Sequence, residues 1–214
     1  MKIVSVVSLK GGTGKTTVAM SLAVAAEADG QSVLLIGLED YRLEVDLDRW
    51  AKTRGNATPA VRACRAEELE DEIAWAKQCG FDLVILDVCC GFIPVTAAVG
   101  LADFVLIPTR VASLDVSGAV PAVNLVREAR KPSAVVVTFY YPAEARELQE
   151  MGLEQTADIC PVRMQLREQY VLSYRAGRSI AEFDPEGGGA AEVEELYRYI
   201  KLRLAGEPGF LSAA

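Results

Sequence analysis

One run of residues, 10–17, constrains this chain more than any other. It reads K-G-G-T-G-K-T-T, follows a strand-like apolar stretch at 2–8 and precedes an alanine-rich, helix-like stretch. Glycines before a helix let backbone N–H groups approach an anion, and a lysine neutralises the charge of that anion. In such a loop Lys15 meets the β and γ phosphates of a nucleotide, and the Thr16 hydroxyl reaches Mg²⁺. The sequence therefore predicts a nucleotide-phosphate site.

The loop contains a second lysine, Lys10, which phosphate binding does not require. The usual spacing G-x-x-x-x-G-K-[ST] has glycine at position 9, where this chain has Leu9. Lys15 already occupies the place beside the phosphates, and two ammonium groups repel each other at short range. Lys10 is therefore expected to reach elsewhere. The residues expected to hold the nucleotide are Gly11, Gly12, Thr13, Gly14, Lys15, Thr16 and Thr17.

Short apolar runs alternate with helix-period segments along the chain. Strands are expected at 2–8, 33–38, 81–87, 103–108 and 133–139, and helices at about 15–29, 44–53, 66–79, 115–130, 143–155, 163–176 and 189–205. Continuous apolar strands are typical of strands buried on both faces. The order predicts an α/β fold with a doubly wound, mostly parallel sheet and helices on both faces. One domain is expected over 1–205, with a flexible break at 184–189 and a flexible tail at 206–214.

Composition narrows the possible chemistry. The 214 residues are 51% hydrophobic and 24% charged, which suits one large core. No apolar run approaches the length of a membrane span and no signal peptide precedes the first strand, so we expect a cytoplasmic protein. Gly206, Pro208 and Gly209 interrupt the last helix before Phe210 and Leu211, so we expect no amphipathic membrane helix there. The chain has no histidine, which excludes histidine-based acid–base catalysis, and its five cysteines show no paired spacing. The net charge of −8 disfavours broad attachment to DNA.

The strand-like run 81–87 supplies a second feature of a nucleotide site. It ends in Asp87 and is followed by Gly91. A phosphate loop needs a carboxylate at the end of a neighbouring strand to hold Mg²⁺, usually through water. We therefore expect Thr16 and Asp87 to bind the metal. Cys89 and Cys90, which come next, are interpreted as small packing residues.

The string at 10–17 closely resembles the deviant Walker A motif of the ParA/MinD family of ATPases. The chain length and later motifs look most like the small ParA proteins of the ParF kind. The resemblance implies a P-loop NTPase fold, ATP and Mg²⁺ as cofactors, and slow hydrolysis of ATP to ADP and phosphate. It also implies that Lys10 crosses an ATP-sandwich homodimer and contacts the phosphates of the partner subunit. Lys10, Lys15 and Asp87 would then be catalytic residues.

Other segments match the family less closely. Relatives commonly end the second strand with D-x-D, whereas this chain has Gly37 and Glu39 at the two acidic positions. Glu39 is expected to orient the attacking water, with Asp40 as the alternative, although a displacement of about 1 Å costs roughly a hundredfold in rate. The resemblance also places the loop around Asp184 and Pro185 beside adenine.

ParA relatives bind DNA without sequence specificity through basic residues near the C-terminus. This chain carries Arg198, Lys201 and Arg203 on the polar face of its last expected helix. These three residues are DNA-binding candidates, although an ordinary solvated helix face has the same composition. The resemblance thus implies a nucleoid-associated, ATP-dependent dimer that positions a plasmid, a chromosome region or a protein assembly. An activating partner protein or cargo adaptor would complete such a system.

Two alternatives stay open from the sequence. The string 87–92 partly resembles the iron proteins that supply electrons to nitrogenase, in which cysteines ligate a [4Fe–4S] cluster at a dimer axis. Gly37, in turn, would suit a nucleotide-dependent scaffold that has lost hydrolysis. The sequence does not decide between Glu39 and Asp40, and it does not identify the cargo.

Overall fold

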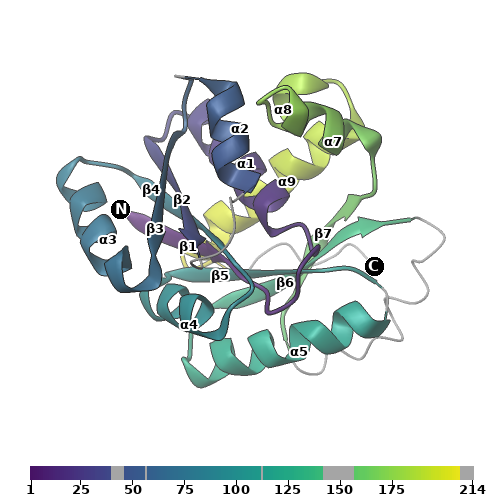
Figure 1. The fold of residues 1–214 in the computed structure, drawn as a ribbon. Coiled ribbons are helices and arrows are strands. Elements are labelled where there is room, and N and C mark those ends of the chain that lie inside the picture. The colour runs from purple at the N-terminus through teal and green to yellow at the C-terminus, as the bar shows by residue number, and fades with distance from the viewer. Residues whose placement is uncertain (40–45, 56, 112, 142–156, 208–214) are drawn as a thin grey trace.

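A computed structural model describes the chain apart from residues 40–45, 56, 112, 142–156 and 208–214, and apart from the side chains of residues 39 and 113–117. Its strands form one parallel sheet in the order β3-β2-β4-β1-β5-β6-β7 (Figure 1). The strands are β1 (Lys2–Val6), β2 (Val33–Glu39), β3 (Ala60–Arg65), β4 (Leu83–Val88), β5 (Phe104–Thr109), β6 (Ser133–Tyr140) and β7 (Ile159–Gln165). The predicted parallel α/β fold is confirmed.

Helices cover both faces of this sheet (Figure 1). One face packs against α1 (Lys15–Ala28), α2 (Asp46–Arg54), α7 (Glu168–Arg175), α8 (Ile180–Phe183) and α9 (Gly188–Leu204). The other face packs against α3 (Leu69–Gln78), α4 (Phe92–Leu101) and α5 (Ser113–Glu128). Each face therefore has its own apolar core, as a doubly wound sheet requires. Within the described residues, no helix is both long and apolar enough to cross a membrane.

The central strand, β1, positions the site. It pairs in parallel with β4 on one side and with β5 on the other. Because the carboxyl ends of parallel strands share one edge, the loop after β1 lies beside the ends of β4 and β5. The register pairs Asp87 of β4 with Val6 of β1 and with Gly37 of β2. This edge is where ligands bind in open α/β sheets.

The two edge strands, β3 and β7, were not predicted. Half of β3 is exposed, and the strand carries charged residues such as Arg62, so it lacks a continuous apolar run. In β7, buried Cys160, Val162 and Met164 alternate with more exposed positions, as in an edge strand. The predicted helix at 163–176 is therefore wrong in its first part, where β7 continues to its end before α7 begins. The predicted helix at 143–155 lies outside the described residues.

The glycine run 187–189 is tightly packed. A Cβ added at Gly188 would lie 2.8 Å from Nη2 of Arg167, and one at Gly189 would overlap the side chain of Ile180. Glycine at these positions permits the close approach of neighbouring side chains to the start of α9. The expectation of a flexible break in this segment is wrong, because glycine serves packing here.

Candidate nucleotide-binding site

Two glycines in the left-handed region shape the loop between β1 and α1. Gly12 has a φ of 74° and Gly14 a φ of 85°, which residues with a Cβ rarely adopt. Gly14 also lies under an aromatic ring, since an added Cβ would be 2.7 Å from Cε2 of Phe139. Position 14 therefore needs glycine both for its backbone and for its packing. Helix α1 begins directly after it, at Lys15.

The Lys15 side chain is buried in the loop. It is 9% exposed, and its Nζ donates to the Lys10 carbonyl at 3.1 Å and to Sγ of Cys90 at 2.9 Å. An ammonium group at the start of a helix, beside free backbone N–H groups, suits phosphate oxygens. Cys90 is exposed and contacts Lys15, so the interpretation of Cys90 as a packing residue is wrong. Its position shortly after Asp87 is the only sequence signal for this contact.

Buried threonines lie under the loop. The Thr138 hydroxyl donates to the Thr13 carbonyl at 2.8 Å and lies 3.2 Å from the Thr109 carbonyl. Thr13 is 1% exposed, and its own hydroxyl has no hydrogen-bond partner among the described residues. A buried hydroxyl without a partner is costly unless a ligand satisfies it. Thr13 thus fits a loop that is completed by a phosphate.

Asp87 lies next to the loop and is 3% exposed. Burial raises the pKa of its carboxyl to about 6, against the lowering effects of the Thr16 hydrogen bond and of the Lys15 charge. The nearby charge of Asp46 raises this pKa further. A carboxylate beside a threonine hydroxyl is the donor set that Mg²⁺ takes next to a phosphate loop. The structure therefore brings Thr16 and Asp87 together in an arrangement that fits Mg²⁺.

The end of β2 leaves the water-orienting residue unassigned. A Cβ at Gly37 would lie 3.2 Å from Cδ2 of Leu47, so α2 leaves little room for a carboxylate there. The side chain of Glu39 and the whole of Asp40 lie outside the described part of the chain. The role of either residue stays a prediction. Asp46, at the start of α2, is an additional carboxylate that we did not predict, because acidic residues are common in first helical turns.

Lys10 and Lys15 point in different directions. A Cβ at Gly118 of α5 would lie 3.0 Å from Cδ and 3.3 Å from Cβ of Lys10. The aliphatic part of Lys10 therefore runs along α5, while the Lys15 ammonium stays inside the loop. Because the two side chains leave the loop in different directions, we expect the two lysines to have different roles. A contact from Lys10 to a partner subunit stays a prediction.

A pocket of about 310 Å³ adjoins the first turn of α1. Its wall includes Thr16, Thr17, Phe139, Arg167, Tyr170 and Tyr174. The rings of Phe139 and Tyr170 meet edge to face, with centroids 5.7 Å apart. Phe139 has a φ of 52°, and such backbone conformations are found mainly where surrounding structure or function holds them. The size and the aromatic lining suit a nucleoside. The sequence did not reveal this pocket, because its wall comes from segments far apart in the chain.

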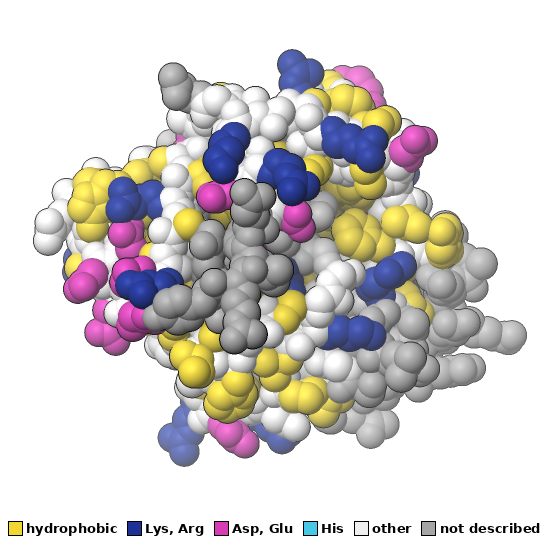
Figure 2. Space-filling view, viewed as in Figure 1, with side chains coloured by type: hydrophobic (Ala, Val, Ile, Leu, Met, Phe, Trp, Pro, Cys, Tyr) yellow, Lys and Arg dark blue, Asp and Glu magenta, His cyan; other side chains and the backbone are white. Residues whose placement is uncertain are grey.

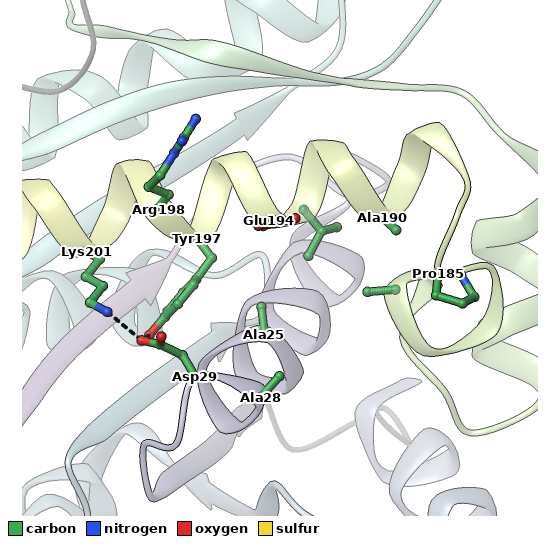
Figure 3. A pocket seen from close by; sticks show the side chains of 11 residues that line it. Ala25, Ala28, Asp29, Pro185, Ala190, Glu194, Tyr197, Arg198 and Lys201 are labelled. Atoms are coloured by element: carbon green, nitrogen blue, oxygen red, sulfur yellow. Dashed lines mark hydrogen bonds and ion pairs between the residues drawn. The ribbon is translucent and has the colours of Figure 1, made fainter.

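Asp184 and Pro185 lie elsewhere. Pro185 lines a second cavity, of about 490 Å³, together with Ala28 from the last turn of α1 (Figure 3). Ala28 is about 18 Å along the helix from Thr16, at about 1.5 Å per residue. The Asp184 carboxylate packs against the backbone of Gly187. The structure does not bring these residues to the phosphate loop.

The three DNA-binding candidates do not form one open positive patch on α9. In Figure 3, Lys201 is directed at Asp29, while Arg198 points away from it. The Lys201 Nζ is 2.6 Å from Oδ2 of Asp29. Arg203 pairs with Asp158 at 3.1 Å, and its side chain is only 19% exposed. The pairing of Lys201 and Arg203 with carboxylates reduces the positive charge that DNA would meet.

A second group of cations lies on α2 and α7, which pack together. Figure 2 shows Lys and Arg side chains over this part of the molecule, whereas Asp and Glu side chains gather near α3. We define the α2–α7 basic surface by its exposed members Arg49, Lys52, Arg175 and Arg178. These residues come from two segments far apart in the sequence, so only the fold joins them.

Cys90, from the string that resembles the iron proteins, lies at the phosphate loop. Among the described residues, no group of three or more His, Cys, Asp or Glu side chains is placed to hold a metal ion. Sγ of Cys90 is 2.9 Å from the ammonium group of Lys15. This contact places the thiol at the phosphate loop, where it bears on nucleotide binding.

A family model described as "VirC1 protein" matches residues 1–136 of this chain. The chain belongs to the VirC1 family. Protein virC1 of Rhizobium rhizogenes is 31% identical to it over 135 residues, which are 60% of this chain and 57% of that protein. The match thus spans little more than half the length of this curated relative, and the matched family region contains the phosphate loop and Asp87.

This VirC1-family chain also has the fold of MinD. A chain of the MinC:MinD cell division protein complex from Aquifex aeolicus superposes with a TM-score of 0.76 and 19% identity, over 99% of this chain and 98% of that one. The septum site-determining protein MinD of Pyrococcus horikoshii, solved with Mg-ADP, gives a TM-score of 0.73 and 18% identity, over 96% and 97% of the two chains. The predicted ParA/MinD type of fold is confirmed.

Proposed function

We propose that this VirC1-family protein is a slow ATPase that uses bound Mg·ATP as a switch. The observation that carries the proposal is the meeting of three groups at one glycine loop. The Lys15 ammonium lies inside the loop, Thr16 lies in the first turn of α1, and Asp87 is buried beside them. This arrangement offers an anion site and a carboxylate next to each other, which is what a nucleotide phosphate with a divalent cation needs.

Each residue of the site has a role in this proposal. Lys15 neutralises the β and γ phosphates, and the Thr13 hydroxyl donates to a phosphate oxygen. Thr16 and Asp87 would hold Mg²⁺, which supplies charge neutralisation for phosphoryl transfer. Glu39, or Asp40 in its place, orients the attacking water. The aromatic pocket holds the nucleoside.

ATP binding would favour a homodimer across the nucleotide face. Phe92 and Ile93, at the start of α4, are 68% and 74% exposed. They follow Cys90 closely in the chain and so lie near the loop that Cys90 contacts. Exposed apolar side chains beside a charged site favour a protein partner. We propose that a second copy covers them and that Lys10 reaches the phosphates of that copy.

The ATP-bound dimer would then bind DNA without sequence specificity and position a cargo, with hydrolysis resetting the cycle. A dimer presents every basic surface twice, so a patch that is weak in the monomer becomes effective by avidity. The cargo would be a plasmid, a chromosome region or a protein assembly, reached through an activating partner protein or cargo adaptor.

The proposal is tested by nucleotide binding and turnover of the full chain. Lys15→Ala should abolish binding of labelled ATP and all Mg²⁺-dependent phosphate release, because no other side chain replaces the ammonium inside the loop. Lys77→Ala, which changes an exposed lysine of α3, should match the wild type. Undiminished ATP binding by Lys15→Ala would contradict the site assignment.

The close packing of Leu47 on Gly37 favours a second candidate, a nucleotide-dependent scaffold without hydrolysis, because the first acidic position of the family pattern holds a glycine and α2 leaves little room for a carboxylate there. Phosphate release measured beside ATP-dependent dimerisation distinguishes the two. Dimers that form without turnover, even with DNA present, would favour the scaffold.

A further inference from the structure

The aromatic pocket has a planar cation in its wall, Arg167, which precedes α7. Its Nη2 donates to Oε1 of Glu192 at 2.6 Å and to Oε1 of Gln165 at 3.2 Å. Glu192 of α9 also accepts from the backbone N–H of Gln165 at 3.2 Å and lies 3.5 Å from the Tyr170 hydroxyl. One carboxylate therefore fixes the guanidinium, the end of β7 and an aromatic residue of the pocket.

The start of α9 closes the other side of Arg167. An added Cβ at Gly188 would be 2.8 Å from Nη2 of Arg167, and one at Gly189 would be 3.3 Å from its Cδ. The arginine therefore lies directly against a turn without side chains. The Arg167 side chain is nevertheless 27% exposed, and the open space next to it is the pocket that it lines.

The charge balance indicates what Arg167 would contact. Glu192 compensates its charge at 2.6 Å, whereas the contacts of Lys15 are a carbonyl and a thiol. Lys15 is therefore the stronger site for phosphate. A guanidinium plane stacks well on a heteroaromatic ring even when its edge is engaged.

We propose that Arg167 reads the nucleobase. Its guanidinium stacks on a purine ring that is held against Tyr170 and Phe139, and Glu192 is the positioning residue that orients it. This inference rests on the proposed nucleotide site and adds base selectivity to it. A pyrimidine, with one ring, covers less of the guanidinium than a purine does. The pocket should therefore favour purine nucleotides.

The test compares ATP with inorganic tripolyphosphate, which has the phosphates but no base. Binding of both is measured by calorimetry on the full chain. Arg167→Lys keeps the positive charge and can still pair with Glu192, but it lacks the plane. It should weaken ATP binding about 5- to 30-fold and change tripolyphosphate binding by less than about twofold, and CTP should lose less than ATP. Because tripolyphosphate needs an intact loop, its retained binding shows that the variant is folded.

Two further variants sharpen the result. Glu192→Gln should weaken ATP binding in the same direction but less, again without affecting tripolyphosphate. Arg163→Ala is the matched control, because Arg163 is an exposed arginine of β7 outside the pocket lining; its binding of both ligands should equal the wild type.

Other outcomes would overturn the inference. Equal losses of ATP and tripolyphosphate in Arg167→Lys would make Arg167 a phosphate contact or a structural residue, and unchanged ATP binding would remove it from the site. If the wild type bound neither ligand, the proposed nucleotide function itself would fail, and base reading would fail with it.

Discussion

At the scale of single residues, Asp87 makes the stability of the fold depend on pH between about 4 and 6. Burial raises its pKa from 3.8 to about 6, so the folded chain binds this proton more tightly than the unfolded chain does. Protonated Asp87 therefore favours the folded state relative to ionised Asp87. This contribution to the free energy of unfolding is fully present below pH 4, is lost as the pH rises through 6, and amounts to at most about 3 kcal/mol. A bound cation beside the carboxylate would offset the cost of charge at neutral pH.

Asp87→Asn removes this titration. The variant should be more stable than the wild type at pH 7, by up to about 3 kcal/mol, and the difference should shrink as the pH falls from 7 to 4. Urea unfolding of both proteins across this pH range measures it. The same variant should lose Mg²⁺-dependent nucleotide binding. A stability difference that does not vary with pH would show that the buried carboxyl does not titrate in this range.

Lys10 is the second residue whose role can be isolated. If its ammonium acts across a dimer, Lys10→Ala should still bind ATP as a monomer but should lose the ATP-dependent dimer and most turnover. Light scattering with and without ATP measures the dimer, and labelled ATP measures binding. An ATP-dependent dimer as abundant as that of the wild type would show that Lys10 does not act across the interface.

At the scale of elements, the start of α9 supports the wall of the aromatic pocket. Its glycines let Arg167 and Ile180 approach the helix backbone more closely than any side chain would permit. A helix normally gains about 1 kcal/mol when glycine is replaced by alanine. The packing reverses that expectation here, because the added methyl group has no space.

Gly189→Ala should therefore destabilise the fold by about 1–3 kcal/mol, as overpacking does. Gly100→Ala in α4 is the control, because nothing lies within 4 Å of a Cβ at that position; it should stabilise by about 0.5–1 kcal/mol. Thermal or urea unfolding compares the two. A stabilised Gly189→Ala variant would mean that the start of α9 is loosely packed.

At the scale of the whole molecule, positive charge is divided between two regions. On α9, Lys201 and Arg203 are paired with Asp29 and Asp158. The α2–α7 basic surface has Arg49 and Lys52 on α2, Arg175 at the end of α7 and Arg178 in the turn that follows α7. Helices α2 and α7 pack together, and Figure 2 shows Lys and Arg side chains on this face. Since the chain has a net charge of −8, any DNA contact must be local.

Charge reversal at each region should identify the DNA contact. If DNA binds the α2–α7 basic surface, Arg49→Glu with Lys52→Glu should remove ATP-dependent DNA binding, whereas Arg198→Glu with Lys201→Glu should weaken it less. Wild-type binding should fall steeply with salt. A gel shift at low salt measures DNA binding by the wild type and by the two double variants. If the wild type does not associate with DNA in the presence of ATP, the DNA part of the proposed function is wrong.

The sequence by itself determined the phosphate loop, the alternation of strands and helices, and the carboxylate at Asp87. These features are local: a glycine loop, an apolar run or a residue at a strand end can be recognised from its immediate neighbours. The five buried strands were predicted for the same reason, since each is a continuous apolar run. The edge strands β3 and β7 were missed, because strands with one side open to water have mixed composition.

Only the tertiary structure decided what meets at the site. The contact of Cys90 with Lys15, the aromatic pocket around Phe139 and Tyr170, and the pairing of Arg167 with Glu192 join segments far apart in the chain. Such contacts depend on strand order and helix packing, which no local pattern encodes. The same reason explains the glycines at the start of α9, whose neighbours Ile180 and Arg167 come from α8 and from the residue that precedes α7.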